Sequence, residues 1–244
     1  MSRIIVLIPA RYQSSRFPGK PLSKIHGKSM IQRVFENCAS SGYESYVVTD
    51  DARIEEHVKA FGGKVIRVDD DVPSGTERIA LALEREIQGV VDLAINVQGD
   101  EPLLRDDAIK ELADIHLESK FDIMTMVKRK ASGHEDFKNP NVVKAMFVEQ
   151  SNQCLYFSRA SIPFDRDGES NFDWFHHLGV YSYRPKALLK FSKSAVSRLE
   201  NIEKLEQLRA LEMGLSIGAL EVNFEPIGVD TPADIHKIEE VIRD

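Results

Sequence analysis

The sequence predicts an α/β protein with a mostly parallel β-sheet, and three observations support this prediction. Short apolar runs of strand length alternate with segments of helical period along the first half of the chain, as in consecutive βαβ units. Hydrophobic residues make up 42% of the 244 positions, and the formal charge is only −7, which is typical of a soluble globular protein. The length allows one large domain with a substantial core.

The first half should supply the parallel strands and the helices that cover them. The expected strands are residues 4–8, 46–49, 64–68 and 91–97. The expected helices are residues 30–41, a short helix capped by Asp50 or Asp51, and a helix opened by Ser74 that runs to residue 87. A polar loop, residues 10–21, joins the first strand to the first helix, and we call it the first loop.

From residue 121 the pattern becomes rich in strands, which either extend the sheet or form a small β subdomain. The expected strands are residues 122–127, 142–148, 154–158, 177–183 and 217–222, and the expected helices are residues 199–213 and 232–242. We find no repeat and no low-complexity linker. We therefore expect a single domain over residues 1–244, with halves at about 1–120 and about 121–244.

Composition excludes several classes of protein. The acidic total argues against nucleic-acid binding, which needs Lys and Arg concentrated on one face. The apolar run after Arg3 is too short for a signal-peptide core or a membrane span. Cys38 and Cys154 have no metal-ligand spacing, so we expect reduced core residues, a cytoplasmic location and no membrane insertion.

The first loop carries three cations, Arg11, Arg16 and Lys20, among Gly and Pro residues. A solvated turn is the alternative, but Arg forks, a Lys point charge and a nearby helix N-terminus together suit a polyphosphate. The loop is not a Walker P-loop, because Pro21 follows Gly19-Lys20, and no GxGxxG follows the first strand.

Two carboxylates are candidate ligands of Mg²⁺. Asp100 directly follows a buried strand, and Asp230 precedes the last helix. Mg²⁺ favours one or two carboxylates together with substrate phosphates and water. The alternative for a single Asp at such a place is a cap or a turn residue, and Asp230 taken alone fits that alternative equally well. The acidic runs 50–51 and 69–71 lie in polar turns, and we do not expect them to bind metal.

Seven blocks spread over nearly the whole chain closely resemble the 3-deoxy-manno-octulosonate (Kdo) cytidylyltransferases, also called CMP-Kdo synthetases. The blocks are IPARYQSSRFPGKPL (8–22), SGTERIA (74–80), NVQGDEPLL (96–104), LYFSRASIPFDRD (155–167), HHLGVYSYR (176–184), LEQLRALEMG (205–214) and GVDTPADI (228–235). The resemblance implies a three-layer αβα nucleotidyltransferase fold, Rossmann-like and similar to the nucleotide-diphospho-sugar transferases. It also implies a mostly parallel mixed sheet and a small β-rich dimerisation region.

The same resemblance implies a homodimer that couples CTP to Kdo for lipopolysaccharide biosynthesis, releases pyrophosphate and requires Mg²⁺. The implied nucleotide-binding residues are Pro9, Ala10, Arg11, Arg16, Lys20, Ser74, Arg78 and Gln98. The implied catalytic residues are Arg16, Lys20 and Asp100, and the implied metal ligands are Asp100 and Asp230. The implied sugar-binding residues are Gln98, Arg159, His177, Tyr181, Glu206 and Gln207. The first half would thus bind the nucleotide, and the second half the sugar and the partner subunit.

Without the resemblance, the second-half residues have plainer interpretations. His177 would be a structural histidine at the head of a strand, with His176 on the opposite face. Glu206 and Gln207 would lie on the solvated face of an amphipathic helix whose Leu205 and Leu208 are buried.

Three positions depart from the family pattern. His176 stands where Arg or Lys is common, Phe164 where Trp is frequent, and Ser29 where Pro is usual. Loss of a fixed cation at His176 would favour a sugar with an amino group, such as 8-amino-3,8-dideoxy-manno-octulosonate (Kdo8N). Further alternatives are a CMP-sugar synthetase for a sialic-acid-like sugar, and a nucleotide-binding regulatory protein without catalysis.

Overall fold

The chain forms two compact units in the computed structural model. The first unit contains Met1–Ala113 and Pro226–Asp244, and the second contains Asp114–Glu225. The structure describes residues 2–13, 17–168, 172–225, 228–229 and 231–242, so Arg16 and Asp230 lie outside the described residues. The C-terminal stretch belongs to the first unit although it follows the second unit in sequence.

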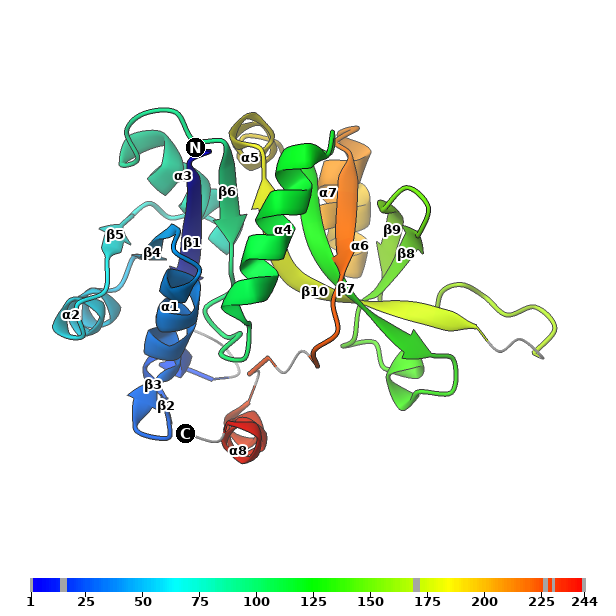
Figure 1. Cartoon of the computed structure of the whole chain (residues 1–244), viewed down its shortest axis with the longest axis horizontal. Helices are drawn as coiled ribbons and strands as arrows, with labels where there is room; N and C mark the ends of the chain where they lie inside the picture. Colours follow the sequence, from blue (N-terminus) through cyan, green and yellow to red (C-terminus); the bar gives the residue numbers. More distant parts are fainter. Residues whose placement is uncertain (1, 14–16, 169–171, 226–227, 230, 243–244) are drawn as a thin grey trace. The chain divides into compact units, whose positions relative to one another are not determined.

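The first unit is built on parallel strands in the order β5-β4-β1-β6 (Figure 1). The strands are β1 (Ile4–Ala10), β4 (Glu44–Thr49), β5 (Val65–Arg67) and β6 (Leu93–Asn96). Every residue of β1 is buried, as expected for a central parallel strand that reads as a continuous apolar run. All four predicted strands of the first half are confirmed, and β1 extends two residues further than predicted, to Ala10.

Helices and a short hairpin complete the first unit, and α1 and α3 both pack against β1 (Figure 1). The helices are α1 (Met30–Ser40), α2 (Ala52–Ala60), α3 (Gly75–Arg85), α8 (Pro232–Val241) and the 3₁₀ turn η1 (Lys20–Leu22); the hairpin strands are β2 (Lys24–Ile25) and β3 (Lys28–Ser29). The side chains of Ser29, Asp51 and Ser74 cap α1, α2 and α3 by accepting backbone N–H bonds. Asp51 is therefore the cap of the second helix.

The second unit is a mixed sheet in the order β10-β7-β11-β9-β8. Its strands are β7 (Ile123–Ala131), β8 (Lys144–Val148), β9 (Gln153–Ser158), β10 (Asp173–Tyr183) and β11 (Ile217–Glu221). β7 runs parallel to β11 and antiparallel to β10. Because β10 begins at Asp173, His177 lies in the middle of a strand, and its predicted place at the head of a strand is wrong.

The helices of the second half differ most from prediction. They are α5 (Pro185–Ser192), α6 (Arg198–Glu203), α7 (Gln207–Glu212) and the 3₁₀ turn η2 (Glu135–Lys138), while α4 (Asp106–Glu118) crosses the boundary between the units. The sequence analysis did not predict α4 or α5. The single helix expected at residues 199–213 is wrong, because Lys204 adopts a left-handed conformation with φ 54° and divides it into α6 and α7.

Both cysteines are buried and free, as predicted. Burial raises the pKa of the Cys154 thiol to about 12 and raises that of Cys38 further, so both remain protonated. Within the described part of the chain, no helix combines the length and the hydropathy needed to cross a membrane.

Candidate active site

Three chain segments meet closely at the carboxyl end of β1. A Cβ atom placed on Gly75 would lie 3.0 Å from Pro9 Cβ, and one on Gly99 would lie 3.0 Å from the Pro9 carbonyl oxygen. A Cβ at either position would require Pro9 to move by a few tenths of an ångström, so glycine suits both close approaches. The structure therefore brings predicted nucleotide residues of β1 next to the start of α3 and the loop after β6, which carry Ser74, Gln98 and Asp100.

Lys20 and Asp100 form an ion pair within this group. Lys20 Nζ lies 2.5 Å from Asp100 Oδ2 and donates a second bond to the Val229 carbonyl at 2.7 Å. Val229 N–H in turn donates to the Asp100 carbonyl at 3.1 Å. The side chains of Lys20 and Asp100 keep 16% and 31% of their exposure, so a ligand can reach both. The first loop, the end of β6 and the C-terminal stretch thus hold one cation against one carboxylate.

Arg11 and Arg78 line a pocket of about 400 Å³ beside the carboxyl end of β4. Arg11 donates to the carbonyls of Val72 at 3.1 Å and Pro73 at 3.3 Å, which ties the start of the first loop to the segment before α3. Two predicted nucleotide residues therefore share one cavity with the start of the first loop.

Arg78 is 2% exposed at its side chain, and Asp50 fixes its guanidinium at 2.7 Å. It also donates to the Val68 carbonyl, and its Nε has no hydrogen-bond partner among the residues that the structure describes. Burial lowers the pKa of Arg78 from its ordinary value, with the Asp50 charge opposing this effect. Arg78 is therefore a buried cation that lines the pocket and whose Nε makes no hydrogen bond within the described residues.

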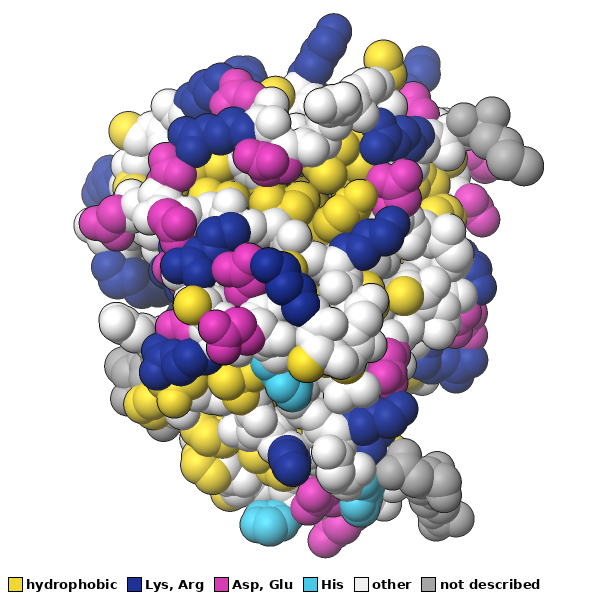
Figure 2. All heavy atoms as spheres, turned by 90° about the vertical axis from the view of Figure 1, so that its left-hand side faces the viewer, with side chains coloured by type: hydrophobic (Ala, Val, Ile, Leu, Met, Phe, Trp, Pro, Cys, Tyr) yellow, Lys and Arg dark blue, Asp and Glu magenta, His cyan; other side chains and the backbone are white. Residues whose placement is uncertain are grey.

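The acidic runs 50–51 and 69–71 pair with arginines. The pairs are Asp50 with Arg78, Asp51 with Arg53, Asp69 with Arg67, and Asp70 with Arg85. On the face seen in Figure 2, Lys and Arg side chains are interspersed with Asp and Glu. No three His, Cys, Asp or Glu side chains gather as a metal site within residues 2–13, 17–168, 172–225, 228–229 and 231–242.

His177 and Tyr181 lie together in the second unit, with ring centroids 5.5 Å apart. Burial lowers the pKa of His177 to about 3, so the ring is neutral at pH 7. His177 Nε2 lies 3.1 Å from Thr125 Oγ1, whose hydroxyl donates to backbone carbonyls of β10. The imidazole must therefore carry its proton on Nε2 and leave Nδ1 as an acceptor.

Gln207, the first residue of α7, is 6% exposed, so the alternative interpretation of a solvated helix face is wrong for this residue. Its Nε2 finds no hydrogen-bond partner in the described structure. A buried donor without an acceptor costs about 1–3 kcal/mol. Burial raises the pKa of Tyr181, and the charges of Tyr183 and Glu206 raise it further. Glu206 is therefore near enough to Tyr181 to act on it electrostatically.

Arg159 makes structural hydrogen bonds to the backbone. Its guanidinium donates to the carbonyls of Glu203 at 2.7 Å, Pro140 at 2.9 Å and Lys204 at 3.4 Å. These bonds tie the end of β9 to the end of α6. A sugar contact by Arg159 stays a prediction and would have to share donors that these carbonyls already use.

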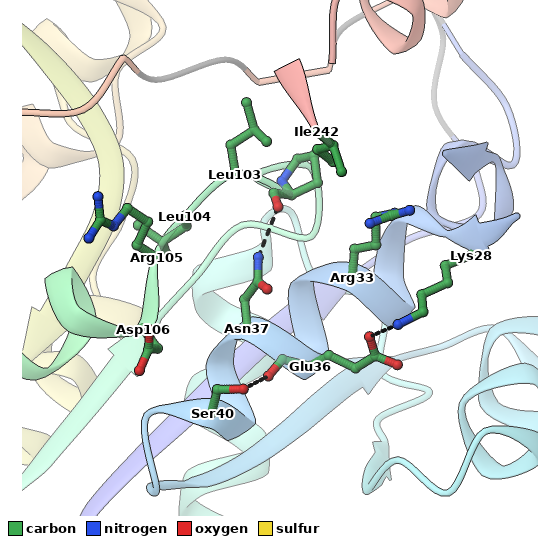
Figure 3. A pocket seen from close by; sticks show the side chains of 11 residues that line it. Lys28, Arg33, Glu36, Asn37, Ser40, Leu103, Leu104, Arg105, Asp106 and Ile242 are labelled. Carbon is green, nitrogen blue, oxygen red and sulfur yellow. Dashed lines mark hydrogen bonds and ion pairs between the residues drawn. The ribbon is translucent and has the colours of Figure 1, made fainter. Parts of the chain in front are cut away.

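A second cavity, of about 410 Å³, lies between α1 and residues 102–106 (Figure 3). It contains none of the predicted site residues. Asn37 Nδ2 donates to the Pro102 carbonyl at 2.9 Å, and Lys28 pairs with Glu36 at 2.8 Å along α1, as the dashed lines show (Figure 3). Asn37 thereby anchors the loop that carries Asp100.

Comparison with known proteins identifies the family. Residues 5–217 match the cytidylyltransferase family. The 3-deoxy-manno-octulosonate cytidylyltransferase of Thermodesulfovibrio yellowstonii is 43% identical over 98% of this chain and 97% of its own length. The chain belongs to the cytidylyltransferase family. The 8-amino-3,8-dideoxy-manno-octulosonate cytidylyltransferase of Shewanella loihica is a similar cytidylyltransferase, 45% identical over 97% of both chains.

Solved structures confirm the predicted fold and enzyme class of this cytidylyltransferase. A CMP:2-keto-3-deoxy-manno-octonic acid synthetase in complex with CTP superposes with a TM-score of 0.90 at 38% identity, over 98% of each chain. The 4-diphosphocytidyl-2C-methyl-D-erythritol synthase of Anaerococcus prevotii shares the fold at 11% identity, with a TM-score of 0.63 over 98% of each chain. The α/β nucleotidyltransferase prediction is therefore confirmed.

Several residues that position the site were not found from the sequence. Thr125 sets the tautomer of His177, Asp50 holds Arg78, and the Val229 carbonyl holds Lys20. A threonine in a strand and a backbone carbonyl leave no sequence signal. The Asp50–Arg78 pair could have been suspected, because buried arginines require partners.

Proposed function

We propose that this cytidylyltransferase couples Kdo to CTP, giving CMP-Kdo and pyrophosphate for lipopolysaccharide biosynthesis. The observation that carries the proposal is the Lys20–Asp100 pair, 2.5 Å apart at the carboxyl end of the central strands. Ligands of open α/β sheets bind at that end. The similarity to a CMP-Kdo synthetase in complex with CTP supports the same proposal.

In the proposed reaction, the anomeric hydroxyl of Kdo attacks the α-phosphorus of CTP in line. A new P–O bond forms to the sugar oxygen, the hydroxyl proton passes to solvent, and the bond to the leaving pyrophosphate breaks. Lys20 exchanges its bond to Asp100 for the triphosphate, which Arg11 and Arg16 would also bind. Such transfers need positioning and charge neutralisation more than covalent chemistry. Pro9, Ala10, Ser74, Arg78 and Gln98 would surround the nucleoside part.

We propose Mg²⁺ as the cofactor, held by Asp100 and Asp230. The donor set fits, because the Asp100 carboxylate is partly exposed and its present partner is a cation, Lys20. Val229 N–H donates to the Asp100 carbonyl, so the described residue that precedes Asp230 in sequence lies beside Asp100. Bound Mg²⁺ would neutralise phosphate charge and polarise the α-phosphate.

The sugar would bind to Gln98, Arg159, His177, Tyr181, Glu206 and Gln207. The unpartnered Nε2 of Gln207 supplies a donor for a carboxylate or hydroxyl oxygen, and the unprotonated Nδ1 of His177 supplies an acceptor for a hydroxyl. Because burial keeps His177 neutral, the acidic sugar meets a hydrogen-bonding ring there, not a cation.

Kdo8N is the second candidate substrate, because relatives named for it are as similar to this chain as relatives named for Kdo. Burial also lowers the pKa of His176 to about 4, so no fixed positive charge stands at that position at pH 7. His176 faces away from His177 by strand alternation, so any effect on the sugar would be indirect.

We further propose that the enzyme acts as a cytoplasmic homodimer. Large apolar side chains are exposed in the second unit, among them Phe164 at 86% and Ile202 at 65%. A subunit interface would cover such side chains. Light scattering during gel filtration would measure the mass, and a monomer at micromolar concentration would contradict the proposal.

The test is pyrophosphate release from CTP, UTP and ATP, each with Kdo, Kdo8N or sialic acid, with Mg²⁺ or EDTA. We expect release only with CTP, an octulosonate and Mg²⁺. Lys20→Ala should lower kcat/KM for CTP by about 10²-fold, while Lys24→Ala, at an exposed nearby lysine, should not. Failure of CTP with both octulosonates would refute the proposal, and faster turnover of Kdo8N would select the second candidate.

A further inference from the structure

Tyr12 of the first loop is stacked by an arginine from a different element. Arg53 Cζ of α2 lies 3.3 Å from the centroid of the Tyr12 ring. A guanidinium at this distance over an aromatic face makes a cation–π contact. The start of the first loop is therefore attached to α2 through a side chain that has no place in the proposed chemistry.

Arg53 is itself held rigidly by Asp51. Its Nε lies 2.9 Å from Asp51 Oδ1, and its terminal nitrogen lies 2.6 Å from Oδ2, a planar two-bond fork. Asp51 also accepts the Arg53 backbone N–H at 3.0 Å as the cap of α2. The hydrogen bond from Arg53 holds the pKa of Asp51 below its ordinary value, so the fork persists at neutral pH.

Tyr12 contacts the far end of the same loop. Gly19 N–H donates to the Tyr12 carbonyl at 2.8 Å, which closes the loop at its stem. Gly19 has a φ of +75°, and a Cβ there would lie 3.2 Å from Tyr12 Cζ. The tyrosine ring therefore rests against the glycine that directly precedes Lys20.

We propose that Asp51, Arg53 and Tyr12 form a latch that fixes the stem of the first loop and thereby positions Arg11 and Lys20 for the triphosphate. This inference rests on the proposed function for its kinetic consequence. Tyr12 and Asp51 line the pocket of Arg11 and Arg78 but Arg53 does not, so Arg53 is a positioning residue that acts through Tyr12 and the loop backbone. Arg53 is 56% exposed at its side chain, and exposed ion pairs add little to global stability, so the latch acts on the loop and not on the fold.

Hydrogen exchange tests the latch without reference to activity. In Arg53→Ala and Tyr12→Ala, the amide of Gly19, followed in a peptide over residues 17–22, should exchange faster than in the wild type. Arg85→Ala is the matched control, since Arg85 makes a similar fork with Asp70 at 2.7 and 3.1 Å, is 51% exposed and lies on α3. Tyr12→Phe should keep the wild-type exchange. Unchanged exchange in Arg53→Ala would overturn the latch.

Kinetics test its consequence. Arg53→Ala and Tyr12→Ala should raise KM for CTP by about three- to tenfold and leave KM for the sugar and Tm unchanged. The control Arg85→Ala should keep the wild-type KM for CTP. Faster exchange with an unchanged KM for CTP would overturn the positioning role. The two proposals can fail separately. A wild type that does not turn over CTP would refute the proposed function, and the hydrogen-exchange result would still show whether the latch exists.

Discussion

Acidification should destabilise this protein through three histidines that are neutral in the fold. Burial lowers the pKa of His116 and His176 to about 4 and that of His177 to about 3, from an ordinary value of 6.5. His116 is the clearest case, because both ring nitrogens have partners. Nε2 lies 3.1 Å from the Phe121 carbonyl and must donate to it, so Nδ1 accepts from the Ser182 hydroxyl at 2.7 Å. A proton on Nδ1 would reverse that second bond, because Nδ1 could then only donate and the Ser182 hydroxyl would have to accept.

The direction and the size of the effect follow from proton linkage. Between pH 6.5 and about 4 the unfolded chain binds protons that the folded chain does not, so the free energy of unfolding falls as the pH falls through this window. For one histidine with a folded pKa of about 4, the loss from pH 7.5 to 5 is about 2 kcal/mol. Three such residues together lose about 6 kcal/mol, a large part of an ordinary domain's stability.

Urea unfolding followed by circular dichroism at pH 7.5, 6.5, 5.5 and 5 measures this loss. His116→Gln should be less stable at pH 7.5 but should lose about 2 kcal/mol less than the wild type on acidification. His236→Gln is the control, because His236 is 81% exposed on α8 and should follow the wild-type curve. Equal losses in His116→Gln and the wild type would refute the assignment of a neutral, buried His116.

Three further outcomes concern the site. Asp100→Ala should lower Mg²⁺-dependent pyrophosphate release by about 10³-fold, whereas Asp107→Ala, at an exposed surface pair, should not; normal activity of the first variant would remove Asp100 from the metal assignment. Gln207→Ala should raise KM for the sugar about tenfold and leave KM for CTP unchanged, and the opposite pattern would move Gln207 to the nucleotide side. Gly99→Ala should lower kcat/KM with little change in Tm, because its Cβ would press on the Pro9 carbonyl. Gly133→Ala is the control, because a Cβ there meets open space. Equal activities of the two variants would show that the loop after β6 can shift to accept the Cβ.

The sequence predicted the parallel half well, because buried strands such as β1 and side-chain caps such as Asp51 leave local signals. It missed α4, although Ile109 and Leu112 have helical spacing, because the helix continues over His116, whose burial depends on partners far away in sequence. It also missed the break at Lys204, where a non-glycine residue adopts a positive φ that no local residue type announces.

For the candidate site, the sequence predicted side chains but not their partners. Lys20 and Asp100 follow from a cationic loop and a strand end, and the structure pairs them. The Val229 carbonyl and Thr125 were beyond prediction, since a backbone acceptor carries no residue identity and a strand threonine is ordinary. Gln207 was identified only by resemblance, because its burial results from the helix break just before it.

The bond from Lys20 to the Val229 carbonyl joins positions that are 209 residues apart in sequence. All residues of the second unit lie between these two positions in the sequence. During synthesis on the ribosome, β1, α1 and β4 emerge and can pair long before residue 229 exists. Lys20 therefore reaches this partner only after residue 229 has been synthesised. A nascent chain can form its central strands early, yet the hydrogen bond that fixes Lys20 beside Asp100 cannot form until residue 229 has left the ribosome.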